Sequence, residues 1–269
     1  MTTITLSQLS IYPVKSLAGI ALSESDLQQT GLRFDRRWMI VTADGKFLTQ
    51  RSQPQMALVH TRIENGQLIL SKHTMPDIQI PPTVTNAKRM LVTVWRDTVS
   101  ATHISKKVDQ WLSEAIGMAC HLVFFPDDVV RGVNPKYSKP GDNTAFADGY
   151  PLLLISQASL DDLNSRLQQP LPMKRFRPNL VVTGCEPYAE DLWKNFQIGD
   201  IRLRIAKPCS RCAITTVDPE TGKYAGKEPL RTLSTYRRQD NMVMFGQNLL
   251  HDNIGKLRIG DRVTVSCRD

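Results

Sequence analysis

The amino-acid sequence predicts a mainly β protein with some helix, an α+β fold, in a chain of 269 residues. Two observations carry this prediction: short apolar stretches alternate with turn residues at regular intervals, and few segments have helical periodicity. Hydrophobic residues make up 41% of the chain, which is enough for a substantial core. A chain of this length forms one large domain or two smaller ones.

Strands dominate the first half of the chain. Residues 4–14 alternate between apolar and polar side chains, and this first strand ends at Pro13. The pairs Asp44-Gly45 and Asn65-Gly66 are typical of tight turns between antiparallel strands. We therefore expect strand–turn–strand units at residues 38–49, 58–71 and 90–102.

A helix and a long loop separate the two halves. Residues 105–116 place their apolar side chains on one helical face, and Gly117 ends the helix. Residues 125–149 are rich in turn-forming residues and are predicted to form a linker or a functional loop. The chain is thus expected to divide into two domains, residues 1–125 and residues 126–269.

The second half mixes strands with one further helix. Residues 152–155 form an apolar strand, and Ser156 or Ser159 then begins a helix that runs to about residue 167. Residues 179–183 form another strand. Residues 196–205 and 257–266 look alike, each with Gly-Asp between two strands. We interpret them as part of a barrel rather than as a site.

Composition excludes some classes of protein and leaves others open. No apolar run reaches the roughly 18 residues that a membrane-spanning helix needs, and residues 1–6 do not resemble a secretory signal. We expect a cytoplasmic protein with no membrane partner. The five cysteines are an odd number, which argues against a disulfide framework. The net charge of +8 suits an anionic partner; its even spread disfavours nucleic acid and permits an anionic cofactor.

Two cysteines, Cys209 and Cys212, lie three positions apart beside Arg211. The pair is consistent with half a zinc site, a redox pair, a structural role, or one thiolate that binds a soft, high-valent metal. The redox interpretation needs a helix that begins between the cysteines, but the segment from Thr215 to Pro219 looks extended. The metal–thiolate interpretation leads, and the others stay open.

Cationic side chains near strand ends are further candidates. Lys15 and Ser16 follow the first strand, where they can bind a phosphate or lie solvated. Arg36 lies next to Asp35 and can bind a phosphate through two hydrogen bonds or form a surface ion pair. Pro178 fixes the direction of its neighbours, Arg177 and Asn179, which can bind a planar polar ligand.

Three other features have weaker signals. Asp148, before the strand at 152–155, is a turn residue or a site residue. Residues 245–248, Phe-Gly-Gln-Asn, form a turn or a binding loop. The histidines are scattered without helical ligand spacing, so we expect none of them to bind a metal. They are His60, His73, His103, His121 and His251.

Taken together, these segments resemble MOSC-domain proteins, in particular the group that holds the bacterial YcbX proteins and the mitochondrial amidoxime-reducing component. The resemblance covers almost the whole chain in order. It rests on Val14-Lys15-Ser16, Asp35-Arg36-x-Trp38, Phe176-Arg-Pro-Asn179, Cys209-Ser-Arg-Cys212 with Thr215-Thr-Val-Asp-Pro219, and Phe245-Gly-Gln-Asn248.

The resemblance implies an N-terminal MOSC-associated β-barrel domain followed by a MOSC β-barrel domain. It implies molybdenum cofactor, with Cys212 as the metal ligand and Asp148 as a catalytic acid near the metal. At family level it also implies binding of pyridoxal phosphate. The residues implied to hold the molybdenum cofactor are Lys15, Ser16, Arg36, Arg177, Asn179, Ser210 and Arg211.

The implied reaction is the two-electron reduction of small N-hydroxylated compounds such as amidoximes, hydroxylamines and N-hydroxylated bases. The alternative is a non-catalytic carrier of sulfur or molybdenum cofactor. YcbX proteins carry a C-terminal ferredoxin-like domain, whereas this sequence stops at Asp269. We therefore expect a separate electron-transfer protein, of the ferredoxin or flavodoxin type.

Overall fold

The computed structural model describes residues 3–81 and 88–266, and it is mainly β, as predicted. Its largest sheet has nine strands in the order β2-β1-β13-β12-β19-β15-β14-β21, and β18 pairs with β19 off this path. This sheet contains β1 (Thr5–Ile11), β2 (Ile20–Leu22), β12 (Leu152–Ser156), β13 (Leu180–Thr183), β14 (Asn195–Ile198), β15 (Ile201–Ser210), β18 (Arg238–Gln239), β19 (Met242–His251) and β21 (Val263–Val265).

Four smaller sheets complete the β structure. One has the order β5-β11-β10-β9, formed by β5 (Trp38–Val41), β9 (Arg89–Val94), β10 (Asp97–His103) and β11 (His121–Phe124). The others comprise β6 (His60–Glu64), β7 (Gln67–Ser71) and β8 (Ile78–Gln79); β3 (Glu24–Gln28), β4 (Gly31–Leu32) and β20 (Gly255–Arg258); and β16 (Val217–Asp218) with β17 (Lys223–Tyr224).

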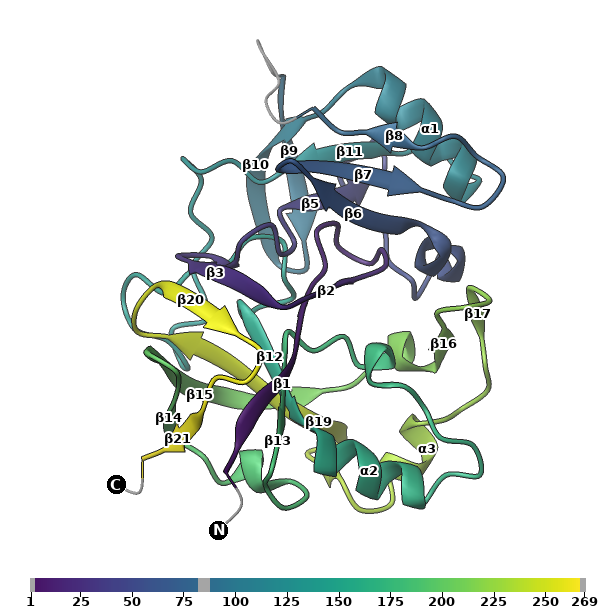
Figure 1. Ribbon diagram of the computed structural model, residues 1–269. Coiled ribbons are helices and arrows are strands. Elements are labelled where there is room, and N and C mark those ends of the chain that lie inside the picture. Colours follow the sequence, from purple (N-terminus) through teal and green to yellow (C-terminus); the bar gives the residue numbers. More distant parts are fainter. Residues whose placement is uncertain (1–2, 82–87, 267–269) are drawn as a thin grey trace.

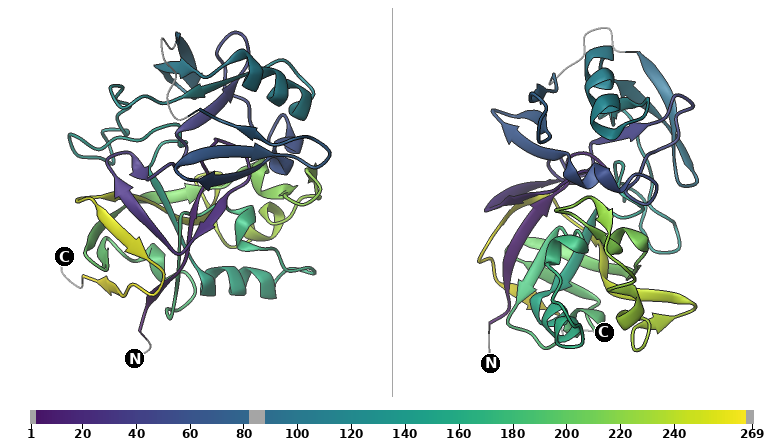
Figure 2. Two further views of the ribbon diagram at one scale, coloured as in Figure 1. Left: turned by 45° about the horizontal axis from the view of Figure 1, so that its top comes forward. Right: turned by 90° about the vertical axis from the view of Figure 1, so that its right-hand side faces the viewer.

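The described residues form three α-helices and four 3-10 helices. Their bounds are α1 (Lys106–Ile116), α2 (Gln157–Ser165), α3 (Leu230–Leu233), η1 (Pro54–Leu58), η2 (Met173–Arg175), η3 (Ala189–Asp191) and η4 (Ala213–Thr216). In Figure 1, α1 lies with strands β5–β11 at the top, whereas α2 and α3 lie beside the large sheet at the bottom. The views in Figure 2 show the same two groups, with β1 extending down into the lower one.

Several local signals in the sequence form the elements that they predict. The unit expected at residues 38–49 forms only in part, because β5 is followed by isolated bridges at Lys46 and Phe47 and by no second strand. Asn65 and Gly66 both have positive φ, 49° and 77°, between β6 and β7, as a tight hairpin turn requires. The Ser105 side chain accepts a hydrogen bond from the Val108 amide, which caps α1 and stabilises it by about 1 kcal/mol. Gly117 ends α1 in the left-handed conformation, with φ of 78°.

The boundary between the predicted domains falls in the connection from β11 to β12, which contains no helix or strand. Four strands before this boundary belong with the second half of the chain. β1 and β2 lie in the large sheet, and β3 and β4 form a sheet with β20. The boundary at 125/126 stays a prediction, and the strand pairing shows that the two halves share hydrogen-bonded sheets.

Two expectations were wrong in detail. Residues 257–266 do not form a hairpin like that of β14 and β15, because β20 pairs with β3 whereas β21 pairs with β14. The segment that follows Cys212 is not wholly extended, because residues 213–216 form η4 before β16 begins. Both errors arise because short segments take their partners from distant strands or adjacent turns, which local patterns do not specify.

Apolar side chains form four clusters. One packs α1 against β5–β8, with Trp111, Leu112 and Met56 buried in it. A second lies on the large sheet. A third joins strands β5 and β9–β11 to the β11–β12 connection through Phe125 and Phe146, whose rings pack edge to face. The fourth packs α2 and α3 against the large sheet. These cores fix the strand ends that form the site described next.

Candidate active site

One cavity of about 320 Å³ is lined by all nine residues that the sequence singled out for a site. They are Lys15, Ser16, Arg36, Asp148, Arg177, Asn179, Ser210, Arg211 and Cys212. Sheet order explains part of this convergence. β1 is antiparallel to β13 and β13 is parallel to β12, so the end of β1 meets the beginnings of β12 and β13 at one edge. β15 ends at Ser210 and leads into Arg211 and Cys212, and its register shifts between Pro208 and Ser210.

Cys212 is held by its backbone while its thiol is exposed. It is the residue before η4, and its carbonyl accepts hydrogen bonds from both the amide and the hydroxyl of Thr215, at 3.1 and 3.0 Å. The Thr216 hydroxyl closes the same turn on the Ala213 carbonyl at 2.8 Å. Both threonines are buried. The Ala-Ile-Thr-Thr run after Cys212 thus fixes this cysteine at the cavity wall with its sulfur free.

Arg211 contacts the other cysteine of the pair. Its Nη1 lies 3.1 Å from the Cys209 sulfur, and its Nη2 donates to the Phe176 carbonyl at 2.5 Å. The position of Arg211 next to Cys212 in the sequence suggests that it favours the Cys212 thiolate. That effect stays a prediction, and the sulfur that Arg211 contacts is that of Cys209. The four cysteines that the structure describes are free, and Cys267 lies outside the described residues.

Arg36 belongs to a network that is mostly internal. Its Nη1 donates to both oxygens of buried Asp35, at 2.9 and 2.7 Å, and to Asn179 Oδ1 at 3.0 Å. Asn179 Oδ1 also accepts from the Leu153 amide, and Asn179 Nδ2 donates to the Ser10 carbonyl. Burial raises the pKa of Asp35, and Arg36 opposes this shift. Asn179 thus orients Arg36, and its predicted contact with a cofactor stays a prediction.

Arg177 is the cation most available to a ligand. Among the described residues its guanidinium forms no hydrogen bond; it lies over the ring of Tyr12, 4.1 Å from the centroid, and Arg36 lies over the same ring at 4.3 Å. Burial lowers the pKa of Arg177 to about 10, so the side chain stays charged at neutral pH. Both arginines have positive φ, 56° and 47°. Such backbone strain costs about 1–3 kcal/mol per residue and is typical of functional sites.

Lys15 and Asp148 form an ion pair at 2.5 Å on the cavity wall. Lys15 is buried and also donates to the Phe146 carbonyl, whereas the Asp148 side chain is 68% exposed. Trp95 Nε1 donates to the same Asp148 oxygen at 2.9 Å. Desolvation opposes ionisation of Asp148, but Lys15 and the indole outweigh it and hold its pKa well below the usual range. Burial lowers the pKa of Lys15, and Asp148 opposes that shift.

The sequence did not reveal the residue that holds the loop before Asp148 in place. Arg131 is buried and donates to the carbonyls of Ala145 and Ala147, at 2.9 and 2.6 Å, and to Asp97 at 2.7 Å. It therefore fixes the backbone that leads to Asp148. No local motif marks this arginine, because its partners are irregular loop carbonyls.

The cavity carries an excess of positive charge. Among the described residues, one acidic side chain, Asp148, lines it. Six cationic side chains line it, and two of them, Arg51 and Lys207, were not singled out in the sequence. The lining cations are Lys15, Arg36, Arg51, Arg177, Lys207 and Arg211. Arg211 Nε is buried without a hydrogen-bond partner among the described residues. These donors fit an anionic ligand such as a phosphate, and the free thiol beside them fits a soft metal ion.

The 245–248 segment contributes one residue to the cavity. Asn248, in β19, lines it and donates to the Pro208 carbonyl at 3.4 Å. Gly246 has φ of 79°, and a Cβ there would lie 2.7 Å from the Leu154 carbonyl, so glycine is required for β19 to approach β12. The segment is thus a strand rather than a turn.

Comparison with known proteins places the chain in a family. Residues 3–119 match the MOSC N-terminal beta barrel domain, and residues 141–264 match the MOSC domain. The chain is 36% identical to mitochondrial amidoxime-reducing component 1 of Mus musculus, over 96% of this chain and 81% of that protein. It is 35% identical to the Homo sapiens protein of the same name, over 96% of this chain and 82% of that protein.

A third relative agrees with the first two. Mitochondrial amidoxime reducing component 2 of Rattus norvegicus is 35% identical, over 96% of this chain and 82% of that protein. Within the described residues, none of the helices has the length and apolar character needed to span a bilayer. Two matched domains and an identity of 33–36% over nearly the full chain confirm the resemblance. The chain belongs to the family of MOSC-domain proteins that includes the mitochondrial amidoxime-reducing components.

Proposed function

We propose that this protein is a molybdenum-cofactor-dependent oxidoreductase that reduces small N-hydroxylated compounds, such as amidoximes and hydroxylamines. One observation supports this most: a single cavity joins the free thiol of Cys212 to six cationic side chains. A thiolate suits molybdenum, and the cations suit the phosphate of the pterin. The names of the relatives as amidoxime-reducing components support the reaction class.

The residues of the chain would divide the work of binding. Cys212 would ligate the metal, and Arg177, Arg36 and Arg211 would hold the anionic end of the cofactor, with Ser16 and Ser210 as polar neighbours. Asn179 and Asp35 would keep Arg36 in place through the bonds described above. When bound, the cofactor would supply the two-electron exchange that N–O reduction requires, which amino-acid side chains cannot supply.

The Lys15–Asp148 pair suggests how a proton is handled. The lowered pKa of Asp148 favours the ionised carboxylate, which disfavours this residue as the acid that donates a proton. Lys15 carries the proton, and its burial lowers its pKa, which makes the ammonium a better donor. We therefore propose that Lys15 donates a proton to the substrate oxygen and that Asp148 holds Lys15 in place. This changes the predicted role of Asp148 from acid to positioning residue.

Three further expectations complete the proposal. Electrons would come from a separate ferredoxin- or flavodoxin-type reductase system. A cytoplasmic location stays a prediction, whereas the relatives above carry the word mitochondrial in their names. Binding of pyridoxal phosphate also stays a prediction.

Turnover distinguishes the enzyme from the carrier. The protein is produced in a host that synthesises molybdenum cofactor, and it is supplied with a small artificial reductant and an amidoxime. We expect the amidine product from the wild-type protein and none from Cys212→Ala. If the protein carries molybdenum in full but reduces neither an amidoxime nor a hydroxylamine, the carrier function is correct and the reductase is not.

A further inference from the structure

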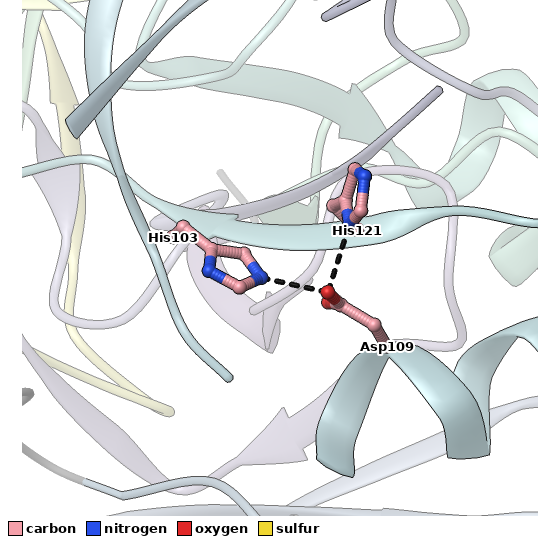
Figure 3. Close-up of side chains that lie close together, drawn as sticks. All are labelled: His103, Asp109 and His121. Carbon is pink, nitrogen blue, oxygen red and sulfur yellow. Dashed lines mark hydrogen bonds and ion pairs between the residues drawn. The ribbon is translucent and has the colours of Figure 1, made fainter. Parts of the chain in front are cut away.

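Two histidines and an aspartate from three different elements lie close together, and none of the three lines the cavity. His103 ends β10, Asp109 lies in the first turn of α1, and His121 begins β11. Figure 3 shows both imidazoles directed at one carboxylate oxygen. His103 Nε2 and His121 Nδ1 each lie 2.7 Å from Asp109 Oδ2.

The Asp109 carboxylate is unusual because it is buried without a lysine or arginine partner among the described residues. The Asp109 side chain is 11% exposed, and among the described residues no lysine or arginine lies within ion-pair distance of it. Buried carboxylates normally pair with a cation or bind a metal ion. Asp109 Oδ1 accepts a hydrogen bond from the Leu122 amide at 3.0 Å. This bond fixes the orientation of the carboxylate and leaves Oδ2 to face the imidazoles.

The three side chains have the chemistry and spacing of a metal site. Two imidazole nitrogens and a carboxylate oxygen are a ligand set that Zn²⁺ and related divalent ions favour. The three ligand atoms lie within 4.8 Å of one another. A tetrahedral zinc ion with bonds of about 2.0–2.1 Å holds its ligands roughly 3.3 Å apart, so small side-chain rotations suffice. His121 is 38% exposed, which gives an ion access from solvent.

We propose that His103 Nε2, His121 Nδ1 and Asp109 Oδ2 bind one divalent transition-metal ion of the zinc type, with water in the remaining position. The ion replaces the two hydrogen bonds to Asp109 and joins β10, α1 and β11 at one point. The sequence predicted no metal role for either histidine, because the 18-residue gap between them does not match helical ligand spacing. Their pairing appears only when β10 lies beside β11.

Zinc binding to the purified full chain tests the proposal. Both cavity cysteines are changed to serine, Cys209→Ser and Cys212→Ser, so that they cannot bind zinc. The protein is freed of metal with a chelator and titrated with zinc chloride by calorimetry. We expect one site per chain, and a rise in the melting temperature on adding zinc. His103→Gln and His121→Gln should each weaken binding at least about tenfold, and His73→Gln, an exposed histidine elsewhere, should not.

Two results would overturn the proposal. The first is no zinc binding at one equivalent by the folded protein. The second is equal zinc affinity in the parent protein, which carries Cys209→Ser and Cys212→Ser, and in both glutamine variants made from it. Glutamine can still donate a hydrogen bond to Asp109, which alanine cannot, so these variants separate loss of metal binding from loss of the fold. Either result would mean that Asp109 joins the two imidazoles by hydrogen bonds alone.

Discussion

At the scale of single residues, the site contains side chains that are free to bind a ligand and side chains that hold other parts of the protein in position. Asn179, Asp35 and Arg131 direct their polar atoms to protein partners, whereas the Arg177 guanidinium and the Cys212 thiol are directed to none among the described residues. A ligand can therefore gain most of its binding energy from contacts with Arg177 and Cys212. Substitutions in the two groups should have different effects, on stability in the first and on cofactor content in the second.

Arg177→Gln tests the binding group. Loss of the cation removes charge-assisted bonds to the proposed phosphate, each worth roughly 1.5–3 kcal/mol. The molybdenum content after expression with cofactor synthesis should fall about tenfold or more, while the free energy of unfolding of the cofactor-free protein changes little. Arg166→Gln is the control, because Arg166 pairs with Asp162 on the surface of α2. Equal molybdenum content in both variants would place the phosphate elsewhere.

The pKa of Asp148 tests the proton assignment. A carboxyl whose pKa is lowered on folding stabilises the folded state above its unfolded pKa of about 4, and this stability is lost as pH falls through the folded pKa. Because the side chain is 68% exposed, the effect on stability is at most about 1 kcal/mol. Titration of the carboxyl carbon by NMR should give a midpoint clearly below 4, and Lys15→Met should raise it. A midpoint above 4 in the wild-type protein would return the role of acid to Asp148.

At the scale of elements, the connection from β11 to β12 depends on Arg131. Arg131→Met leaves two backbone carbonyls, of Ala145 and Ala147, without their donor inside the protein. The cost is about 2 kcal/mol or more in the free energy of unfolding, measured with urea. Faster cleavage of residues 125–151 by a protease should accompany it. Arg89→Met, which breaks an exposed pair with Asp128, should cost less than about 1 kcal/mol. Similar costs for both variants would show that Arg131 does not hold the connection.

The helices and strands also show how much of the fold could be predicted from the sequence. The hairpin with the Asn-Gly turn, and α1 with its serine cap and terminal glycine, follow from local physics and were predicted. The hairpin expected at the Asp-Gly turn forms only in part, because residues 46–49 make isolated bridges and no strand. η4 and the separate pairing of β20 and β21 were not predicted, because their hydrogen-bond partners are set by tertiary contacts. The contact of Arg211 with Cys209 was missed for the same reason.

At the scale of the whole molecule, the site exists because distant strands share one sheet. Nine of the residues that line the cavity were predicted from motifs or from the family resemblance, but their convergence depends on β1 pairing with β13 across more than 170 residues. Arg51, Trp95 and Lys207 complete the cavity without a motif of their own. The same long-range pairing of β10 with β11 creates the His103–Asp109–His121 cluster.

X-ray absorption at the molybdenum edge tests the central claim most directly, because it counts the sulfur atoms bound to the metal. Wild-type protein loaded with cofactor is compared with Cys212→Ser and with the matched control Cys209→Ser. We predict that Cys212→Ser has one molybdenum–sulfur bond fewer and at least about a hundredfold lower turnover of an amidoxime, since even outer-shell changes at metal sites cost 10–100-fold. Cys209→Ser should keep the wild-type sulfur count. Loss of the sulfur in Cys209→Ser, or in neither variant, would contradict the assignment of Cys212 as the ligand.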